Sequence, residues 1–208
     1  MAFFNSFCQP LGRMKSELLI NFARWVSTPE AHSLILNRNE FCFEGAGKLI
    51  CPLHQCVVQN EQSYAAVKPI LDEIAASKFP LLSDRVPFRV EVSLIVPGGE
   101  VTEHQDQHLM HLLCERVHVP VVTDGSTCFY SRWFTDPNWE SFQMLAGGVY
   151  RLNNRVPHKV KNASDKYRIH LIIDYIRTEH LEMYKNNIDE LDDRYVITTA
   201  SDAYWYRG

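Results

Sequence analysis

The sequence predicts a mainly β fold with flanking helices, and two features carry this prediction. Between residues 87 and 176, short runs that alternate and are rich in β-branched residues recur at about ten-residue spacing. Before and after this region, apolar residues recur at helical spacing instead. Many short strands separated by turns are typical of a β-sandwich or barrel, and they do not fit a parallel α/β sheet.

The first third of the chain is expected to be helical and mixed. Residues 16–26 and 63–77 place apolar side chains on one helical face, with Pro69 near the first turns of the second helix. Residues 42–58 contain short β-like runs broken by Gly45 and Gly47. We expect both helices to pack on a sheet as a buttress.

The strands follow from residue 87 onwards, and the chain ends with a helix over residues 179–191 and an aromatic tail over 202–208. No repeat or linker interrupts the chain, so we expect one domain over residues 1–208. It is divided into a buttress (1–86), a β core with the functional site (87–176), and a C-terminal helix and tail (177–208). The predicted strands are 88–96, 100–106, 115–123, 127–134, 145–152, 157–161 and 167–176.

Composition narrows the class of protein. The chain is 46% hydrophobic and 22% charged, which excludes a disordered chain. Its 21 Lys and Arg against 25 Asp and Glu leave a net charge of −4, so we expect no nucleic-acid partner. We see no apolar run of membrane-spanning length and no secretory signal. We therefore expect no membrane association, a cytoplasmic location and free thiols on the six cysteines.

The most informative chemical pattern is His104-Gln105-Asp106. Residues i and i+2 of a strand face the same side, so this imidazole and carboxylate would converge. His158, 52 residues beyond Asp106, can supply a third ligand from a later strand. Two His and one carboxylate leave open metal positions, as non-haem Fe(II) oxygenases require for O₂ and a co-substrate. From these residues alone, a polar cluster satisfied by hydrogen bonds is an equal alternative.

Arg168 lies in an otherwise apolar predicted strand, ten residues after His158. A buried guanidinium is costly unless it is paired, and its planar fork fits a carboxylate. The distal carboxylate of a dicarboxylic keto acid would suit it, and a structural ion pair with Asp174 or a more distant acid is the alternative. Arg116 and His118 likewise share one face of a predicted strand.

Three stretches, in order, resemble the motifs of a known family. The first runs from Ser93 through a Pro-Gly pair to His104, eleven residues on. The second is the Arg-x-His of residues 116–118, and the third places Arg168 after His158. All three are similar to the aspartyl/asparaginyl β-hydroxylase family of Fe(II)/2-oxoglutarate-dependent oxygenases.

The resemblance covers about residues 88–176 and implies a double-stranded β-helix, that is, a jelly-roll or cupin-like fold. The best-known members carry Gly at the position of Asp106 and bind iron through two His, so this chain departs by offering a third ligand. The implied iron ligands are His104 and His158. The implied binding residues of 2-oxoglutarate are Arg168 and Ser93 on its distal carboxylate, and Arg116 and His118 in contact with it near the metal.

Three further groups have a less specific interpretation. We expect His108 and His111 in a loop, as surface or substrate-side residues. Asn153 and Asn154 are expected to form a turn, with orientation of His158 as the alternative. A third group is aromatic, and we expect its members in the core more than on a substrate platform: Phe129, Tyr130, Trp133, Phe134 and Trp139.

We therefore expect a dioxygenase that uses Fe(II), O₂ and 2-oxoglutarate to hydroxylate an unactivated C–H bond of an amino-acid side chain, forming succinate and CO₂. The substrate would be a peptide or a free or carrier-bound amino acid. Two alternatives stay open. One is a non-catalytic metal-binding cupin-like sensor or binding module, which needs no 2-oxoglutarate. The other is a cupin-type isomerase or hydrolase that uses its metal as a Lewis acid and turns over without O₂.

Overall fold

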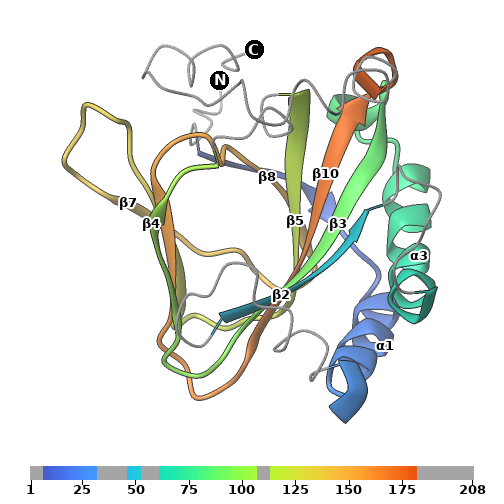
Figure 1. Ribbon diagram of the computed structural model, residues 1–208, viewed down its shortest axis with the longest axis horizontal. Coiled ribbons are helices and arrows are strands. Elements are labelled where there is room, and N and C mark those ends of the chain that lie inside the picture. The colour runs from blue at the N-terminus through green and yellow to red at the C-terminus, as the bar shows by residue number, and fades with distance from the viewer. Residues whose placement is uncertain (1–6, 32–45, 53–60, 107–112, 182–208) are drawn as a thin grey trace.

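The computed structural model describes residues 7–31, 46–52, 61–106 and 113–181, with the backbone alone for residues 46–52 and 61–64. Two antiparallel sheets face each other, and two helices cover the outer side of the larger sheet (Figure 1). The prediction of a mainly β fold with flanking helices is confirmed. No helix in these ranges is long and apolar enough to cross a bilayer.

The larger sheet has six strands and the smaller sheet has four. The larger sheet has the order β1 (Cys8–Arg13), β8 (Gly148–Leu152), β5 (Cys114–Val122), β10 (Arg168–Arg177), β3 (Arg85–Ile95), β2 (Ala46–Pro52). The smaller sheet has the order β4 (Glu100–His104), β9 (His158–Asn162), β6 (Thr127–Ser131), β7 (Glu140–Phe142). The helices are α1 (Ser16–Val26) and α3 (Glu61–Ala76), followed by a short 3₁₀ turn, Pro80–Leu82.

Side chains of β10 alternate between an apolar face of the larger sheet and an opposite face that is polar except at Ile172. Leu171 and Ile173 point toward the helices and are fully buried in the main core. Arg168, His170 and Asp174 occupy the alternate positions and are buried on the opposite face. β3 and β5 are in the same phase, because His170 pairs with Ser93 and Asp174 pairs with Arg116 in register. The side facing the smaller sheet therefore carries a column of buried polar groups.

A second apolar cluster closes the space between the two sheets. Ile95 and Leu152 from the larger sheet pack with Val101, Phe129 and Val160 from the smaller one.

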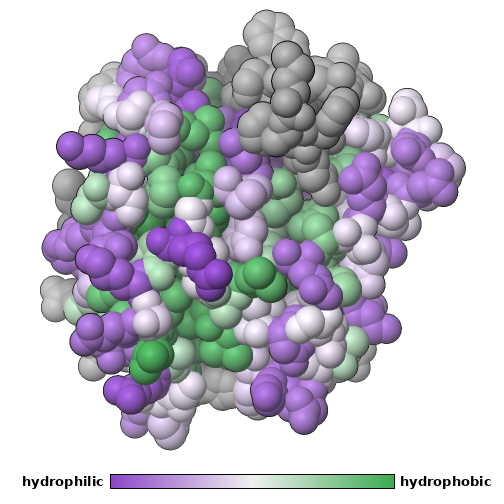
Figure 2. All heavy atoms as spheres, turned by 180° about the vertical axis from the view of Figure 1, so that it is seen from behind, coloured by the Kyte–Doolittle hydropathy of each residue, from purple (hydrophilic) through white to green (hydrophobic). Residues whose placement is uncertain are grey.

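On the outside, Figure 2 views the molecule from behind and shows hydrophobic residues in recesses between projecting hydrophilic side chains. Cys8, Cys114 and Cys128 carry free thiols, as expected.

Several predicted boundaries need correction. Pro69 lies in the interior of α3, at the ninth of sixteen residues, and not near the first turns. Packing of Val67, Ile70 and Ile74 into the main core offsets the lost backbone hydrogen bond. The predicted strand at 145–152 begins only at Gly148, because Gly147 adopts a φ of 80° in a turn.

Two strands were not predicted at all, β1 and the three-residue β7. β1 contains Pro10 and Gly12 and lies at the edge of the larger sheet, where a missing N–H is tolerated. Since β1 and β2 join this sheet, the first third supplies strands as well as helices. The one-domain organisation and its three segments stay a prediction. Residues 178–181 are helical, and beyond them the predicted C-terminal helix and the aromatic tail lie outside the described residues.

Candidate metal centre

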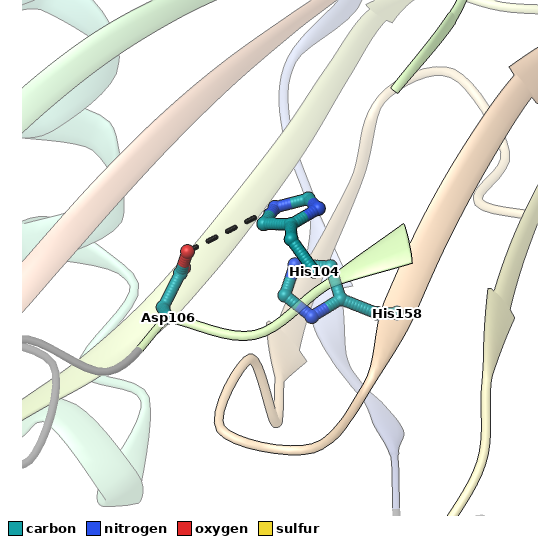
Figure 3. A group of neighbouring side chains, drawn as sticks. All are labelled: His104, Asp106 and His158. Atoms are coloured by element: carbon teal, nitrogen blue, oxygen red, sulfur yellow. Dashed lines mark ion pairs between the residues drawn. The ribbon is translucent and has the colours of Figure 1, made fainter. Parts of the chain in front are cut away.

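His104, Asp106 and His158 meet where the ends of two neighbouring strands of the smaller sheet lie side by side. His104 ends β4 and pairs in register with His158, which begins β9. Asp106 lies just beyond β4 and turns its carboxylate toward His104 (Figure 3). The distance from His104 Nε2 to Asp106 Oδ1 is 3.9 Å. One ligand atom from each of the three residues lies within 4.8 Å of the others.

Backbone carbonyls fix the orientation of both imidazoles. His104 Nδ1 donates to Thr102 O at 2.8 Å, and His158 Nδ1 donates to Val156 O at 2.9 Å. Because a carbonyl oxygen only accepts, each Nδ1 carries the proton and each Nε2 carries the lone pair. Metal-binding histidines are commonly held this way. Burial, with a smaller effect of His104, lowers the pKa of His158 to about 4, so this ring is in the neutral form that binds metals.

In the part of the chain that the structure describes, two side chains donate to one oxygen of Asp106. Arg116 Nη1 and Asn154 Nδ2 both donate to Oδ2, the latter at 2.7 Å. The backbone N–H of Asp106 also donates to Asn154 O at 3.1 Å. Oδ2 is thereby turned toward its donors, and Oδ1 is turned toward His104. This arrangement presents one carboxylate oxygen to a metal and fits the donor set of two nitrogens and one oxygen.

Arg116 links this carboxylate to the larger sheet. Its Nε and Nη2 donate to the two oxygens of Asp174 at 2.8 and 3.0 Å, a bidentate pair. Burial alone lowers the pKa of Arg116, but Asp174 and Asp106 outweigh it and raise the pKa. The guanidinium is therefore charged and neutralised by carboxylates. The predicted contact of Arg116 with 2-oxoglutarate stays a prediction, and the structure places this side chain against Asp106.

Arg168 has a different environment. Its side chain is buried; Nη1 donates to Ser93 Oγ at 3.2 Å and Nη2 to His170 Nδ1 at 2.8 Å. Within the described ranges no carboxylate forms an ion pair with it, and Asp174, its predicted alternative partner, is bound to Arg116 instead. Burial lowers the pKa of Arg168 to about 9, an effect that Glu91 partly offsets. A buried cation without an ion-pair partner favours an anionic ligand.

His118 lies beside this group. It is buried, and its Nδ1 is 3.4 Å from His170 Nδ1. Its partner His170 was not recognised from the sequence, although its position two residues after Arg168 on one strand places both on the same face. Arg168 and His170 line a small cavity between the sheets together with Phe129, Met144 and Val160.

The less specific predictions have mixed outcomes. Asn154 orients Asp106, a role that the sequence did not suggest. Phe129 is buried and stacks on His158, with ring centroids 5.7 Å apart, so it supports the metal centre as a core residue. Tyr130 and Trp139 are not core residues: both lie under Lys159 on the outer side of the smaller sheet. Trp133 and Phe134 pack on an apolar cluster as expected. His108 and His111 lie outside the described residues.

The fold is shared with several solved structures. The chain is similar to the non-heme alpha ketoglutarate dependent epimerase SnoN from nogalamycin biosynthesis (13% identity, TM-score 0.60, 81% of this chain and 75% of that one). It is also similar to HygX from Streptomyces hygroscopicus (10% identity, TM-score 0.60, 84% and 85%) and to a prolyl hydroxylase from Trichoplax adhaerens (12% identity, TM-score 0.60, 86% and 87%). This likeness confirms the jelly-roll prediction.

The family assignment rests on the sequence. The family model described as Aspartyl/Asparaginyl beta-hydroxylase matches residues 42–178, which is more than half of the chain. The chain belongs to this family, and it is an oxygenase of the hydroxylase class. No curated protein matches the chain.

Proposed function

We propose that the chain is an Fe(II)- and 2-oxoglutarate-dependent dioxygenase that hydroxylates an unactivated C–H bond of an amino-acid side chain. The substrate is a peptide or a small molecule such as a free or carrier-bound amino acid. One O₂ and one 2-oxoglutarate are consumed for each C–H bond converted to C–OH, and succinate and CO₂ are released. The proposal rests on the family and on the two polar groups between the sheets, the metal centre and the Arg168 group.

The metal centre is assigned to three side chains. His104 and His158 would bind Fe(II) through Nε2, because their Nδ1 protons are held by backbone carbonyls. Asp106 would bind through Oδ1, because Arg116 and Asn154 hold Oδ2. Three protein ligands on one side leave positions for a co-substrate and O₂, and the iron supplies O₂ activation.

The single observation that favours an oxygenase over a sensor is the environment of Arg168. A binding module has no need for a buried guanidinium without a carboxylate partner in the described part of the chain, which is costly in an apolar strand. The distal carboxylate of 2-oxoglutarate would neutralise this guanidinium. Ser93 is adjacent, because its Oγ lies 3.2 Å from Arg168 Nη1. Arg168 and the metal ligands would thus bind the two ends of the same co-substrate.

The experiment is a turnover assay with purified protein, Fe(II), 2-oxoglutarate and O₂. A panel of amino acids and peptides is screened for succinate release and for a product heavier by one oxygen atom. His158→Ala should abolish both signals, whereas His180→Ala is the matched control because that ring is far from the cluster in sequence and partly exposed. Equal succinate release by the wild type and His158→Ala would contradict the proposal. Product formation without O₂ would favour the Lewis-acid alternative.

A further inference from the structure

His170 has a tautomer that its neighbours dictate. Arg168 Nη2 donates to His170 Nδ1 at 2.8 Å, and a guanidinium can only donate. Nδ1 of His170 therefore carries the lone pair, and the proton of this buried, neutral ring is on Nε2. His118 Nδ1 lies 3.4 Å from the same lone pair on His170 Nδ1. This contact favours a proton on Nδ1 of His118.

The Nε2–H of His170 has no hydrogen-bond partner within the described residues, and the side chain is only 2% exposed. A buried donor without a partner loses its hydrogen bonds to water and gains none in return, so such groups are normally satisfied by a ligand or a water molecule. His170 lines the small cavity between the sheets, and Arg168 lines the same cavity. Nε of Arg168 is also buried, and no atom of the described ranges forms a hydrogen bond with it.

Ser93 completes the group. It pairs in register with His170 across β3 and β10, and its hydroxyl accepts from Arg168 Nη1. An accepting hydroxyl still has its own hydrogen to donate. One cation and two neutral donors are thus gathered on neighbouring strands, and no carboxylate of the described part of the chain forms an ion pair with the cation.

We propose that His170 is a third anchor of 2-oxoglutarate, whose distal carboxylate accepts a hydrogen bond from its Nε2–H beside Arg168 and Ser93. This inference rests on the proposed function, because it assigns a further residue to the same co-substrate. His118 has a positioning role here, since its contact with Nδ1 holds the ring that makes the bond. The pocket selects for a keto acid that ends in a carboxylate.

The first test compares 2-oxoglutarate with 2-oxopentanoate, which has the same chain length and lacks the distal carboxylate. Dissociation constants are measured by calorimetry on Zn(II)-loaded protein, which does not turn over. His170→Phe should raise the Kd of 2-oxoglutarate about 10-fold or more, because a hydrogen bond to a charged group is lost. The Kd of 2-oxopentanoate should change by less than about threefold.

Two variants serve as controls. His170→Gln keeps an N–H donor and should recover most of the affinity for 2-oxoglutarate. Met144→Leu alters the lining of the same cavity without removing a donor, and it should leave both dissociation constants close to those of the wild type. Far-ultraviolet circular dichroism establishes that each variant is folded.

The second test observes the bond in the wild type and needs no variant to fold. In protein labelled with ¹⁵N-histidine and loaded with Zn(II), the His170 proton should be on Nε2. It should move downfield with 2-oxoglutarate and stay in place with 2-oxopentanoate. A proton on Nδ1, or an unmoved Nε2–H in the saturated complex, would overturn the inference even if His170→Phe weakens binding.

The outcomes separate the inference from the function on which it rests. If the wild type does not bind 2-oxoglutarate at all, the proposed function fails and the inference fails with it. If the wild type binds 2-oxoglutarate and His170→Phe binds it equally well, only the role of His170 is refuted.

Discussion

Replacing Asn154 with Ala tests whether the hydrogen bond from Asn154 orients the Asp106 carboxylate for metal binding. Asn154 Nδ2 donates to Asp106 Oδ2 at 2.7 Å, and the amide is only 3% exposed, so water does not readily replace it. The variant keeps the backbone bond from Asp106 N to Asn154 O and the contact with Arg116. The carboxylate loses the amide donor that, together with Arg116, turns Oδ1 toward His104. Metal affinity should therefore fall while the fold is retained.

The size of the effect follows from these contacts. A hydrogen bond to a charged group contributes about 1.5–3 kcal/mol, and each 1.4 kcal/mol is tenfold in affinity. Partners of metal ligands typically contribute about 10- to 100-fold. Since Arg116 still holds Oδ2, we expect the lower end, about a 10-fold weaker affinity. Removing Arg116 is a poorer test, because it breaks the bidentate pair with the buried Asp174 and costs about 3–5 kcal/mol of stability.

The assay is competition for Zn(II) or Co(II) against a chromophoric chelator, with unfolding measured in parallel. Asn153→Ala is the matched control: Asn153 precedes Asn154, and its side chain accepts from Arg155 N at 3.3 Å. Its metal affinity should equal that of the wild type. If Asn154→Ala and Asn153→Ala bind the metal equally well, the reasoning on Asp106 is refuted.

Three further predictions concern the rest of the structure. Arg168→Ala should raise the 2-oxoglutarate concentration for half-maximal succinate release at least ~10-fold, and a normal requirement would remove Arg168 from the site. Burial lowers the pKa of His118 and His170 well below the usual value, with Arg168 adding to the effect. As the pH falls below about 6.5, the unfolded chain binds protons that the folded chain does not, so the free energy of unfolding falls. Urea titrations of metal-free protein from pH 7.5 to 5 should show this loss, and His170→Phe should reduce the slope by about 1.4 kcal/mol per pH unit; an unaltered slope would contradict it. Leu171→Ala should lower the free energy of unfolding by about 2–5 kcal/mol, because Leu171 is fully buried against the helices, and a loss below 1 kcal/mol would contradict the packing.

Most of the fold could be predicted because its central strands place an apolar residue at every second position. In β10, the apolar residues Ile169, Leu171 and Ile173 occupy every second position, and this pattern predicts a strand without any knowledge of its partners. β1 could not be predicted, because Pro10 and Gly12 are poor strand residues. This segment forms a strand only because it pairs with β8. The interior position of Pro69 in α3 likewise depends on tertiary packing, which local propensity does not contain.

The site shows the same division between local and long-range information. The short spacing of His104 and Asp106 allowed the sequence to predict that they meet, but the predicted strand over 100–106 ends at His104. Asp106 reaches His104 from beyond the strand, where Asn154 holds its backbone N–H and its carboxylate. The contacts that hold Asp106 depend on how the strands are ordered in the sheets. Arg116 also binds Asp174, 58 residues away in sequence, and Asn154 lies in the segment before β9. Such partners are set by register, which a single sequence does not reveal.

The most direct test of the account is an anaerobic titration of the Fe(II)-loaded protein with 2-oxoglutarate, followed in the visible spectrum. Chelation of the iron by the keto acid should give a saturable charge-transfer band. The band should form at far higher concentrations in Arg168→Ala, and it should be absent in His158→Ala. Iron binding without any such band in the wild type would contradict the claim that this site is the centre of a 2-oxoglutarate-dependent oxygenase.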